Sequence, residues 1–560
     1  MARNAAISFR AAIDGAAYPP RCSRYGSSPH DEVHMSSCFD AFPYRSQRMP
    51  VFARNVVSTS QPLAAQAGLR ALLAGGNAVD AALATAITLT VVEPVMNGIG
   101  GDMFAMVWDG SALHGLNSSG CAPAAWTRKH FAGRSQMPRT GWDTVTVPGQ
   151  VAGWKALADR FGKLAFAQLF EPAIDYAQQG FQVSPRIARQ WAMQAPALMH
   201  EPGFASAFAK DGAVPRAGQS WRFPEQARTL QQIAETGGEA FYRGPLAEAI
   251  AAHAQRTGGS ISLADLAAHR AQWVTPIAQN YRGLTLHEIP PNGQGIAALI
   301  ALGLLEHFDL GPVDSARFYH LQIEAMKLAF ADLHAHVADP AAMTVRPEAL
   351  LDPAYLAERA RLIDPHRANM PTAGLPKSGG TVYLTAADAS GMMVSFIQSN
   401  YRGFGSGVVV PGTGIALHSR GENFSLQAGH PNEVAPGKRP FHTIIPGFVT
   451  RQGVPVMAFG VMGGAMQAQG HLQMMTRLAD FGQNPQTMSD APRFRVDPDC
   501  VGLESDVDPQ VAATLGRWGH NVAIAARDSL EFGAAQLIQR SDAGYVAASD
   551  ARRDGQAVGY

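Results

Sequence analysis

The chain has 560 residues with 45 basic and 45 acidic side chains, so its formal net charge at pH 7 is zero. This balance excludes the basic surface typical of nucleic-acid-binding proteins and the cationic patch of a membrane-surface protein. The four cysteines are widely scattered and form no CxxC or Cys/His ligand pattern (Cys22, Cys38, Cys121 and Cys500). Neither a disulfide framework nor a zinc site is therefore predicted.

The first 34 residues are rich in Ser, Pro, Arg and His and show no hydrophobic periodicity. We interpret them as a disordered tail or an over-extended start, with Met35 as the initiator. Arg10 and Asp14 interrupt the region in which a secretion signal needs an apolar run. The longest apolar segment, residues 81–92, is too short to span a membrane. These observations predict a cytoplasmic protein without a membrane partner.

Helical and strand-like patterns alternate along the first two thirds of the chain. A strand is predicted over 51–60, followed by helices over 62–73 and 77–92, a glycine turn over 97–102 and a strand over 103–108. Further helices are predicted over 154–161, 166–179, from 185 onward, and over 239–256, 263–269, 297–308 and 318–336. Residues 341–378 carry several prolines and polar residues, and we expect an irregular linker there.

The last third of the chain is predicted to be rich in strands. These cover 381–386, 392–398, 414–418, 443–450 and 454–459, and a helix follows over 467–481. Helix-rich and strand-rich blocks in this order fit an α+β fold in which helices cover stacked sheets.

The strand that begins at Thr381 directly follows Gly379-Gly380. A main-chain cut before Thr381 would place its free α-amino group beside its own hydroxyl. The amine could then act as the general base for that hydroxyl. The sequence therefore predicts cleavage between Gly380 and Thr381 and a threonine nucleophile.

Four motifs in a fixed order are similar to those of one enzyme family: Thr381, the turn at 404–407, the GKRP segment at 437–440 and Gly463-Gly464. Together they resemble the gamma-glutamyltransferase (gamma-glutamyltranspeptidase) family of N-terminal-nucleophile hydrolases, over residues 51–560. The resemblance implies a four-layer αββα sandwich without metal or cofactor. It also implies a large subunit (35–380) and a small subunit (381–560), which form a heterodimer or a dimer of heterodimers.

The resemblance also implies roles for residues near the nucleophile. Gly463 and Gly464 correspond to the family's oxyanion-hole glycines, whose backbone must approach the developing charge closely. Ser399 replaces a threonine that binds the nucleophile's hydroxyl. Two residues later the family has an asparagine, and here either Tyr401 occupies that position or Asn400 takes the role after a small backbone shift.

The substrate-binding positions depart from the family pattern. Ser119 occupies the position of an arginine that holds the glutamyl α-carboxylate in a bidentate pair. Glu422-Asn423 replaces an acidic pair that binds the α-amino group.

Two further departures affect the pocket itself. His442-Thr443 replaces a serine pair, with His442 either facing the substrate as a cation or forming a neutral wall. The segment 425–436 is too short for the extended lid of other members, which predicts a more open pocket for a small-molecule amide.

We therefore predict a self-processing amidohydrolase or acyltransferase that cleaves γ-glutamyl amides such as glutathione through an acyl-enzyme on Thr381. Hydrolysis is favoured over transfer. Two alternatives stay open: an amidase for another small amide, of the oxamate type or an N-acyl compound, and an unprocessed binding or scaffold protein. The α/β serine hydrolases are disfavoured because the chain has no GxSxG motif.

Overall fold

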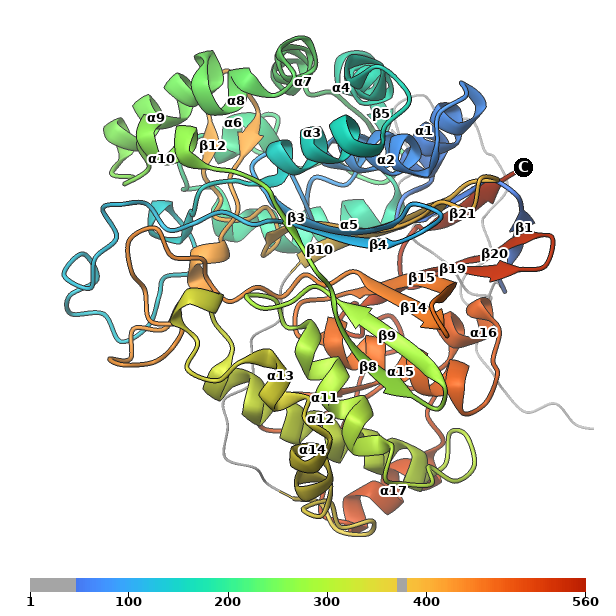
Figure 1. Ribbon diagram of the computed structural model, residues 1–560. Helices are drawn as coiled ribbons and strands as arrows, with labels where there is room; N and C mark the ends of the chain where they lie inside the picture. The colour runs from blue at the N-terminus through green and yellow to red at the C-terminus, as the bar shows by residue number, and fades with distance from the viewer. Residues whose placement is uncertain (1–46, 370–379) are drawn as a thin grey trace, which may run out of the picture.

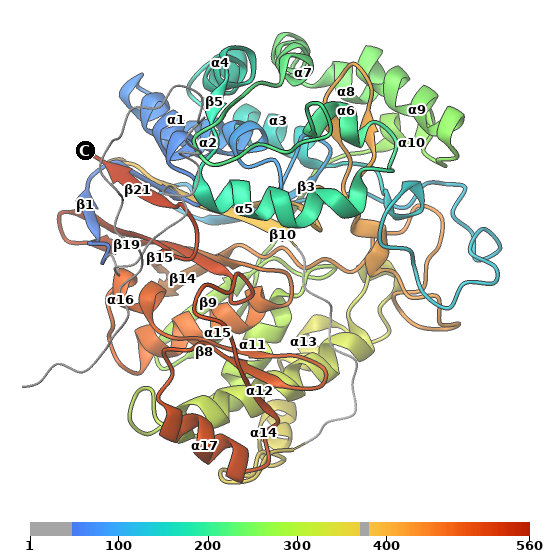
Figure 2. The ribbon, with the colours of Figure 1, turned by 180° about the vertical axis from the view of Figure 1, so that it is seen from behind.

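The computed structural model describes residues 47–369 and 380–560. Two sheets lie face to face in the middle of the molecule, and a group of helices covers the outer face of each (Figure 1). Figure 2 shows the same four layers from behind. This arrangement confirms the predicted four-layer αββα sandwich.

Each sheet has seven strands, which follow one another from one edge to the other in the order below. Sheet A consists of β1 (Val51–Ala53), β20 (Gly544–Ser549), β19 (Ala534–Ser541), β15 (Val454–Met462), β14 (Gly447–Arg451), β9 (Leu284–Glu288) and β8 (Ile277–Tyr281). Sheet B consists of β21 (Gln556–Gly559), β2 (Val56–Thr59), β10 (Gly380–Ala387), β11 (Met393–Tyr401), β3 (Asp102–Trp108), β4 (Leu113–Ser118) and β7 (Gln272–Val274). Short strands outside these sheets are β5 (Phe181–Gln182), β6 (Ser220–Trp221), β12 (Val409–Val410), β13 (Ile415–Ala416), β16 (Phe494–Val496), β17 (Val501–Leu503) and β18 (Val522–Ile524).

The helices divide into two groups by position in the chain (Figure 1). Those on the side of sheet B are α1 (Pro62–Leu73), α2 (Ala78–Val92), α3 (Gln150–Phe161), α4 (Glu171–Gln179), α5 (Pro185–Gln194), α6 (Phe204–Phe208), α7 (Pro224–Thr236), α8 (Glu239–Arg243), α9 (Pro245–Thr257) and α10 (Leu263–Ala268). Those on the side of sheet A are α11 (Gly295–Leu305), α12 (Ala316–His336), α13 (Pro347–Leu350), α14 (Pro353–Ala360), α15 (Met466–Ala479), α16 (Pro485–Asp490) and α17 (Pro509–Arg517).

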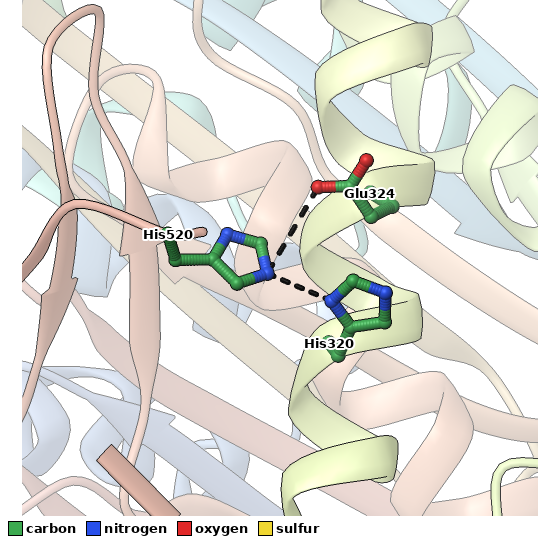
Figure 3. A group of neighbouring side chains, drawn as sticks. All are labelled: His320, Glu324 and His520. Carbon is green, nitrogen blue, oxygen red and sulfur yellow. Dashed lines mark hydrogen bonds and ion pairs between the residues drawn. The ribbon is translucent and has the colours of Figure 1, made fainter. Parts of the chain in front are cut away.

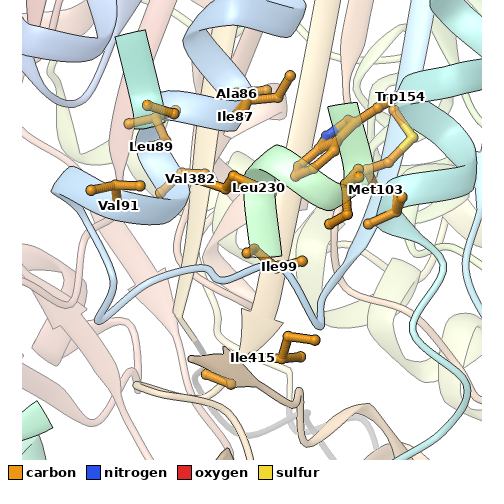
Figure 4. Close-up of a cluster of buried hydrophobic side chains, with 14 of the residues drawn as sticks. Ala86, Ile87, Leu89, Val91, Ile99, Met103, Trp154, Leu230, Val382 and Ile415 are labelled. Carbon is orange, nitrogen blue, oxygen red and sulfur yellow. The ribbon is translucent and has the colours of Figure 1, made fainter. Parts of the chain in front are cut away.

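Strand β10 shows how the side chains distribute between the layers. Val382, Leu384 and Ala386 pack into the core under the helices of sheet B. Tyr383 and Ala387 point the other way, into the core between the two sheets. Figure 4 shows Val382 among side chains from α2. The two-residue period of a strand accounts for this alternation. Packing on both faces therefore holds β10 in place from Val382 onward.

Most predicted elements are present, and the exceptions have local causes. The helix predicted over 239–256 is interrupted at Gly244-Pro245, because proline lacks the N–H that a continuous helix requires. The linker predicted over 341–378 was wrong in part, since α13 and α14 lie within it. The strand predicted over 51–60 is split into β1 and β2. Residues 1–34 lie outside the described residues, as do residues 370–379.

Among the described residues, no helix combines the length and the apolar character needed to cross a membrane.

Candidate active site

Thr381 lies at the start of β10, opposite a β-bulge in the neighbouring strand β11. Gly380 pairs with Tyr401 and Val382 pairs with Gln398, so Thr381 faces two residues of β11, Ser399 and Asn400, and the extra residue belongs to β11. Its side chain is fully buried. The hydroxyl donates to Ser399 Oγ at 3.3 Å and accepts a hydrogen bond from Gln467 Nε2 at 3.1 Å. The hydroxyl thus contacts two polar side chains from other elements, one of them from the bulge in β11.

Ser399 therefore contacts Thr381, as the resemblance implied, while its role in catalysis stays a prediction. Gln467 was not predicted. It lies in the first turn of α15, three residues after Gly464, and this position beside the glycine pair is the signal that could have identified it.

Gly463 and Gly464 form the turn between β15 and α15. Their φ angles are +128° and +62°, a region in which only glycine is free of strain. The carbonyl of Gly464 accepts from Gln294 Nε2 at 2.8 Å. Because α15 begins right after this turn and carries Gln467 onto Thr381, the glycine pair lies close to the nucleophile. Its predicted role as an oxyanion hole requires this proximity.

Asp102 is a buried carboxylate across β11 from the nucleophile. It lies on β3 opposite Ser399, and two backbone N–H groups donate to its Oδ1. His442 Nε2 and His418 Nδ1 lie 3.1 and 3.3 Å from its Oδ2. Burial alone would raise the pKa of Asp102, but the two histidines outweigh it and hold that pKa far below the usual range. Asp102 is therefore ionised and fully engaged.

His442 is fully buried and forms part of this cluster. Its Nδ1 accepts from the backbone N–H of Ile444, so Nε2 carries the proton and donates to Asp102. Burial, together with the charge of Arg420, lowers the pKa of His442 to about 3. The imidazole is neutral at physiological pH, which favours the interpretation of His442 as a wall.

The hydroxyl of Ser119 is engaged by two amide side chains. It donates to Asn117 Oδ1 at 2.8 Å and accepts from Asn292 Nδ2 at 3.3 Å. The sequence around Ser119 contains no arginine, yet the fold brings Arg439 to it: Arg439 Nε donates to the carbonyl of Ser119 at 3.1 Å. Arg439 Nη1 donates to Gln272 at 2.8 Å, so this guanidinium is used within the protein.

Glu422 forms a two-point salt bridge with Arg402. Arg402 Nε binds one carboxylate oxygen, and Nη2 lies 2.5 Å from the other. The carbonyl of Asn423 accepts from Asn432 Nδ2 at 2.6 Å. Glu422 and Asn423 were predicted to bind a substrate amino group. Arg402 already neutralises the carboxylate of Glu422, so no unpaired negative charge is available there for that amino group.

Tyr401 and Asn400 point in different directions. The N–H of Tyr401 donates to Ser399 Oγ at 2.7 Å, and its φ of +73° turns the chain out of β11. Asn400 faces the glycine turn, where a Cβ at Gly98 would lie 2.9 Å from its Nδ2. Neither polar atom of the Asn400 side chain has a hydrogen-bond partner within the described residues. This orientation does not support the prediction that Asn400 takes over the role of the family's asparagine, which binds the nucleophile.

Arg420 is a further residue that sequence reasoning missed. It begins a 3₁₀-helix, Arg420–Asn423, and is fully buried. Its Cζ lies 4.5 Å from the centre of the Tyr401 ring, and Nη1 donates to Thr443 Oγ1 at 2.8 Å. Its place two residues before Glu422 in the sequence is the signal that could have identified it.

A second buried cluster lies on α12, away from Thr381. Figure 3 shows His320 and Glu324 beside His520. His320 Nδ1 lies 2.7 Å from His520 Nε2, and Lys327 Nζ donates to Glu324 at 2.7 Å. The ammonium group of Lys327 thus provides the positive charge that pairs with the carboxylate of Glu324. Glu324 also accepts from the N–H of Asn369 at 2.9 Å, so we interpret the cluster as structural.

These features agree with comparisons to known proteins. A family model described as gamma-glutamyltranspeptidase matches residues 64–560. The chain belongs to this family. It is 36% identical to the glutathione hydrolase-like YwrD proenzyme of Bacillus subtilis, over 90% of this chain and 98% of that protein. It is 37% identical to the oxamate amidohydrolase proenzyme of Klebsiella pneumoniae, over 89% and 97% of the two chains.

A solved structure agrees with this assignment. The crystal structure of cephalosporin acylase from Bacillus halodurans superposes with a TM-score of 0.90 at 47% identity, covering 93% of this chain and 98% of that one. The protein is thus an enzyme of the N-terminal-nucleophile hydrolase type. The named activities of these relatives differ, so family membership establishes the reaction class and leaves the substrate open.

Proposed function

We propose that this family member is a precursor that cuts itself between Gly380 and Thr381 and then hydrolyses a small amide through an acyl-enzyme on Thr381. The observation that carries the proposal is the placement of the Thr381 hydroxyl opposite the β11 bulge, within hydrogen-bond distance of both Ser399 and Gln467. The word "proenzyme" in the names of both curated relatives supports the cleavage step.

The self-cleavage forms one ester and breaks one peptide bond. The Thr381 hydroxyl attacks the carbonyl carbon of Gly380, the C–N bond breaks, and the proton of the hydroxyl passes to the departing α-amine. Water then hydrolyses the ester, leaving a carboxylate on Gly380 and a free amine on Thr381. Residues 1–380 and 381–560 stay associated as a heterodimer because β10 is a central strand of sheet B.

Turnover repeats the same chemistry on a substrate. The freed α-amine takes the proton of the Thr381 hydroxyl as it attacks the amide carbonyl. The amine of the substrate leaves with that proton, and water hydrolyses the acyl-enzyme. Backbone N–H groups at Gly463-Gly464 stabilise the oxyanion in both steps.

Two substrate classes follow from different observations. γ-Glutamyl amides such as glutathione are favoured by the likeness to a glutathione hydrolase-like protein. Amides of an acyl group without an α-amino group are favoured by the salt bridge that occupies Glu422. The likeness to an oxamate amidohydrolase and to a cephalosporin acylase supports the second class.

Intact mass spectrometry under denaturing conditions tests the proposal. We expect the wild-type protein to give two fragments, the smaller beginning at Thr381, and Thr381→Ala to stay uncut and inactive. Thr381→Ser is the matched control: it keeps a hydroxyl and should still cleave, more slowly. A Thr381→Ala chain that splits at this bond would rule out the mechanism, and an uncut wild-type chain would favour a binding protein.

A further inference from the structure

Arg420 is a buried charge for which the described residues provide no counter-ion in direct contact. Its one hydrogen bond goes from Nη1 to the neutral hydroxyl of Thr443, while Nε and Nη2 have no hydrogen-bond partner within the described residues. Burial lowers the pKa of Arg420, to about 10, so it is charged at neutral pH. A buried charge without a partner is strongly unfavourable and rare in folded proteins. Such a group is expected to have a partner that comes from outside the chain.

The two acids whose charges act on Arg420 are already engaged. Asp102 is bound by its histidines and two backbone N–H groups. Glu422 is held by the two-point salt bridge to Arg402. Neither is therefore available to pair with Nε and Nη2 of Arg420.

The position of Arg420 connects it to the nucleophile on two sides. Tyr401, whose ring lies against the guanidinium, is the residue of β11 that pairs with Gly380 at the cleavage site. On the other side, the carbonyl of Thr443 accepts from Gln294 Nε2, which also donates to the carbonyl of Gly464. Arg420 thus lies between the start of β10 and the glycine turn.

We propose that Arg420 binds a carboxylate on the acyl part of the substrate, so that the enzyme acts on monoamides of dicarboxylic acids. The inference rests on the proposed amidohydrolase function and names its substrate class. Nε and Nη2 lie on one edge of the planar guanidinium and match the two oxygens of a carboxylate. The ring of Tyr401 against the guanidinium face holds that edge in place.

The charges around the site also specify what the acyl group lacks. An α-ammonium group needs an unpaired acid, and Arg402 neutralises the acid at 422. The preferred acyl group therefore carries a carboxylate and no α-amino group. Glutaramate, which is L-glutamine without its amino group, should be a better substrate than L-glutamine.

The test measures ammonia release by the processed wild-type enzyme and by Arg420→Met and Arg420→Lys. The panel holds oxamate, malonamate, succinamate and glutaramate, the neutral diamide of each, and L-glutamine. We expect at least one monoamide to exceed its diamide by about 100-fold in kcat/KM, as for a buried charge-paired contact. In Arg420→Met this ratio should fall towards one, because only the monoamide carries the carboxylate that Arg420 binds. Arg420→Lys should retain part of the ratio.

The outcomes separate this inference from the proposed function. Failure of the wild-type chain to split before Thr381 would overturn the function itself. Three results with a processed enzyme would overturn the inference alone. The enzyme could prefer diamides or L-glutamine, or it could release ammonia from no monoamide. The monoamide-to-diamide ratio could also be unchanged in Arg420→Met. Cleavage of Arg420→Met between residues 380 and 381 shows that the variant has folded.

Discussion

Two fully buried arginines in this molecule have opposite environments. Arg493, between α16 and β16, donates from Nη2 to Asp550 at 2.6 Å and to the carbonyl of Ser489 at 2.9 Å. Its Nη1 donates to the carbonyl of Phe532 at 2.9 Å, so only Nε is unmatched within the described residues. Arg420, equally buried, has a single hydroxyl partner there.

The difference shows how to separate an arginine that stabilises the fold from one that serves a ligand. Asp550 has a pKa held well below the usual range because Arg493 and Arg552 outweigh the effect of its burial. The chain thus supplies the counter-ion of Arg493 itself. At Arg420 the described residues supply none in contact, and the site beside Thr381 is where a substrate anion would provide it.

The largest expected effect is on stability. Arg493→Met removes one of the two arginines that pair with the buried Asp550 and should lower the free energy of unfolding by about 3 kcal/mol, the lower end for a broken buried pair, because Arg552 still contacts Asp550. Arg420→Met removes a charge without a counter-ion in contact and should leave stability unchanged or raise it. Denaturant unfolding of both variants checks this contrast. Equal losses in the two variants would mean that Arg420 is also a structural residue.

A smaller effect is expected from the acid at 422. Arg402→Met frees the carboxylate of Glu422, which could then bind an α-ammonium group. We expect kcat/KM for L-glutamine relative to glutaramate to rise about 3- to 10-fold. The double variant Arg402→Met with Glu422→Gln is the control and should show no gain. If the double variant also gained activity on L-glutamine, the loss of Arg402 alone would cause the gain, and the freed carboxylate of Glu422 would not.

Local patterns were sufficient for much of the fold. The helix predicted over 62–73 coincides with α1, and the helix predicted over 263–269 ends one residue beyond α10, which Ser262 caps. Capping and periodicity depend on neighbours in sequence, so local patterns report them. The strand at Thr381 was predicted for the same reason. The linker expected over 341–378 failed since proline can also begin a helix, as it does in α13 and α14.

The candidate site was harder to predict because its contacts join distant segments. Gln467 reaches Thr381 across 86 positions, and Arg439 reaches Ser119 across 320. The salt bridge that occupies Glu422 depends on how the chain turns after Tyr401, which no local pattern reports. The subunit boundaries, the roles of the site residues and the cytoplasmic location stay predictions.

The most direct test of the role of Arg420 is calorimetric titration of the processed enzyme with the dicarboxylate products oxalate, malonate, succinate and glutarate. We predict that at least one binds the wild-type enzyme and binds Arg420→Met at least about tenfold more weakly, because the guanidinium pairs with a carboxylate. Equal binding by the two proteins, or no binding of any dicarboxylate to the wild type, would contradict the account.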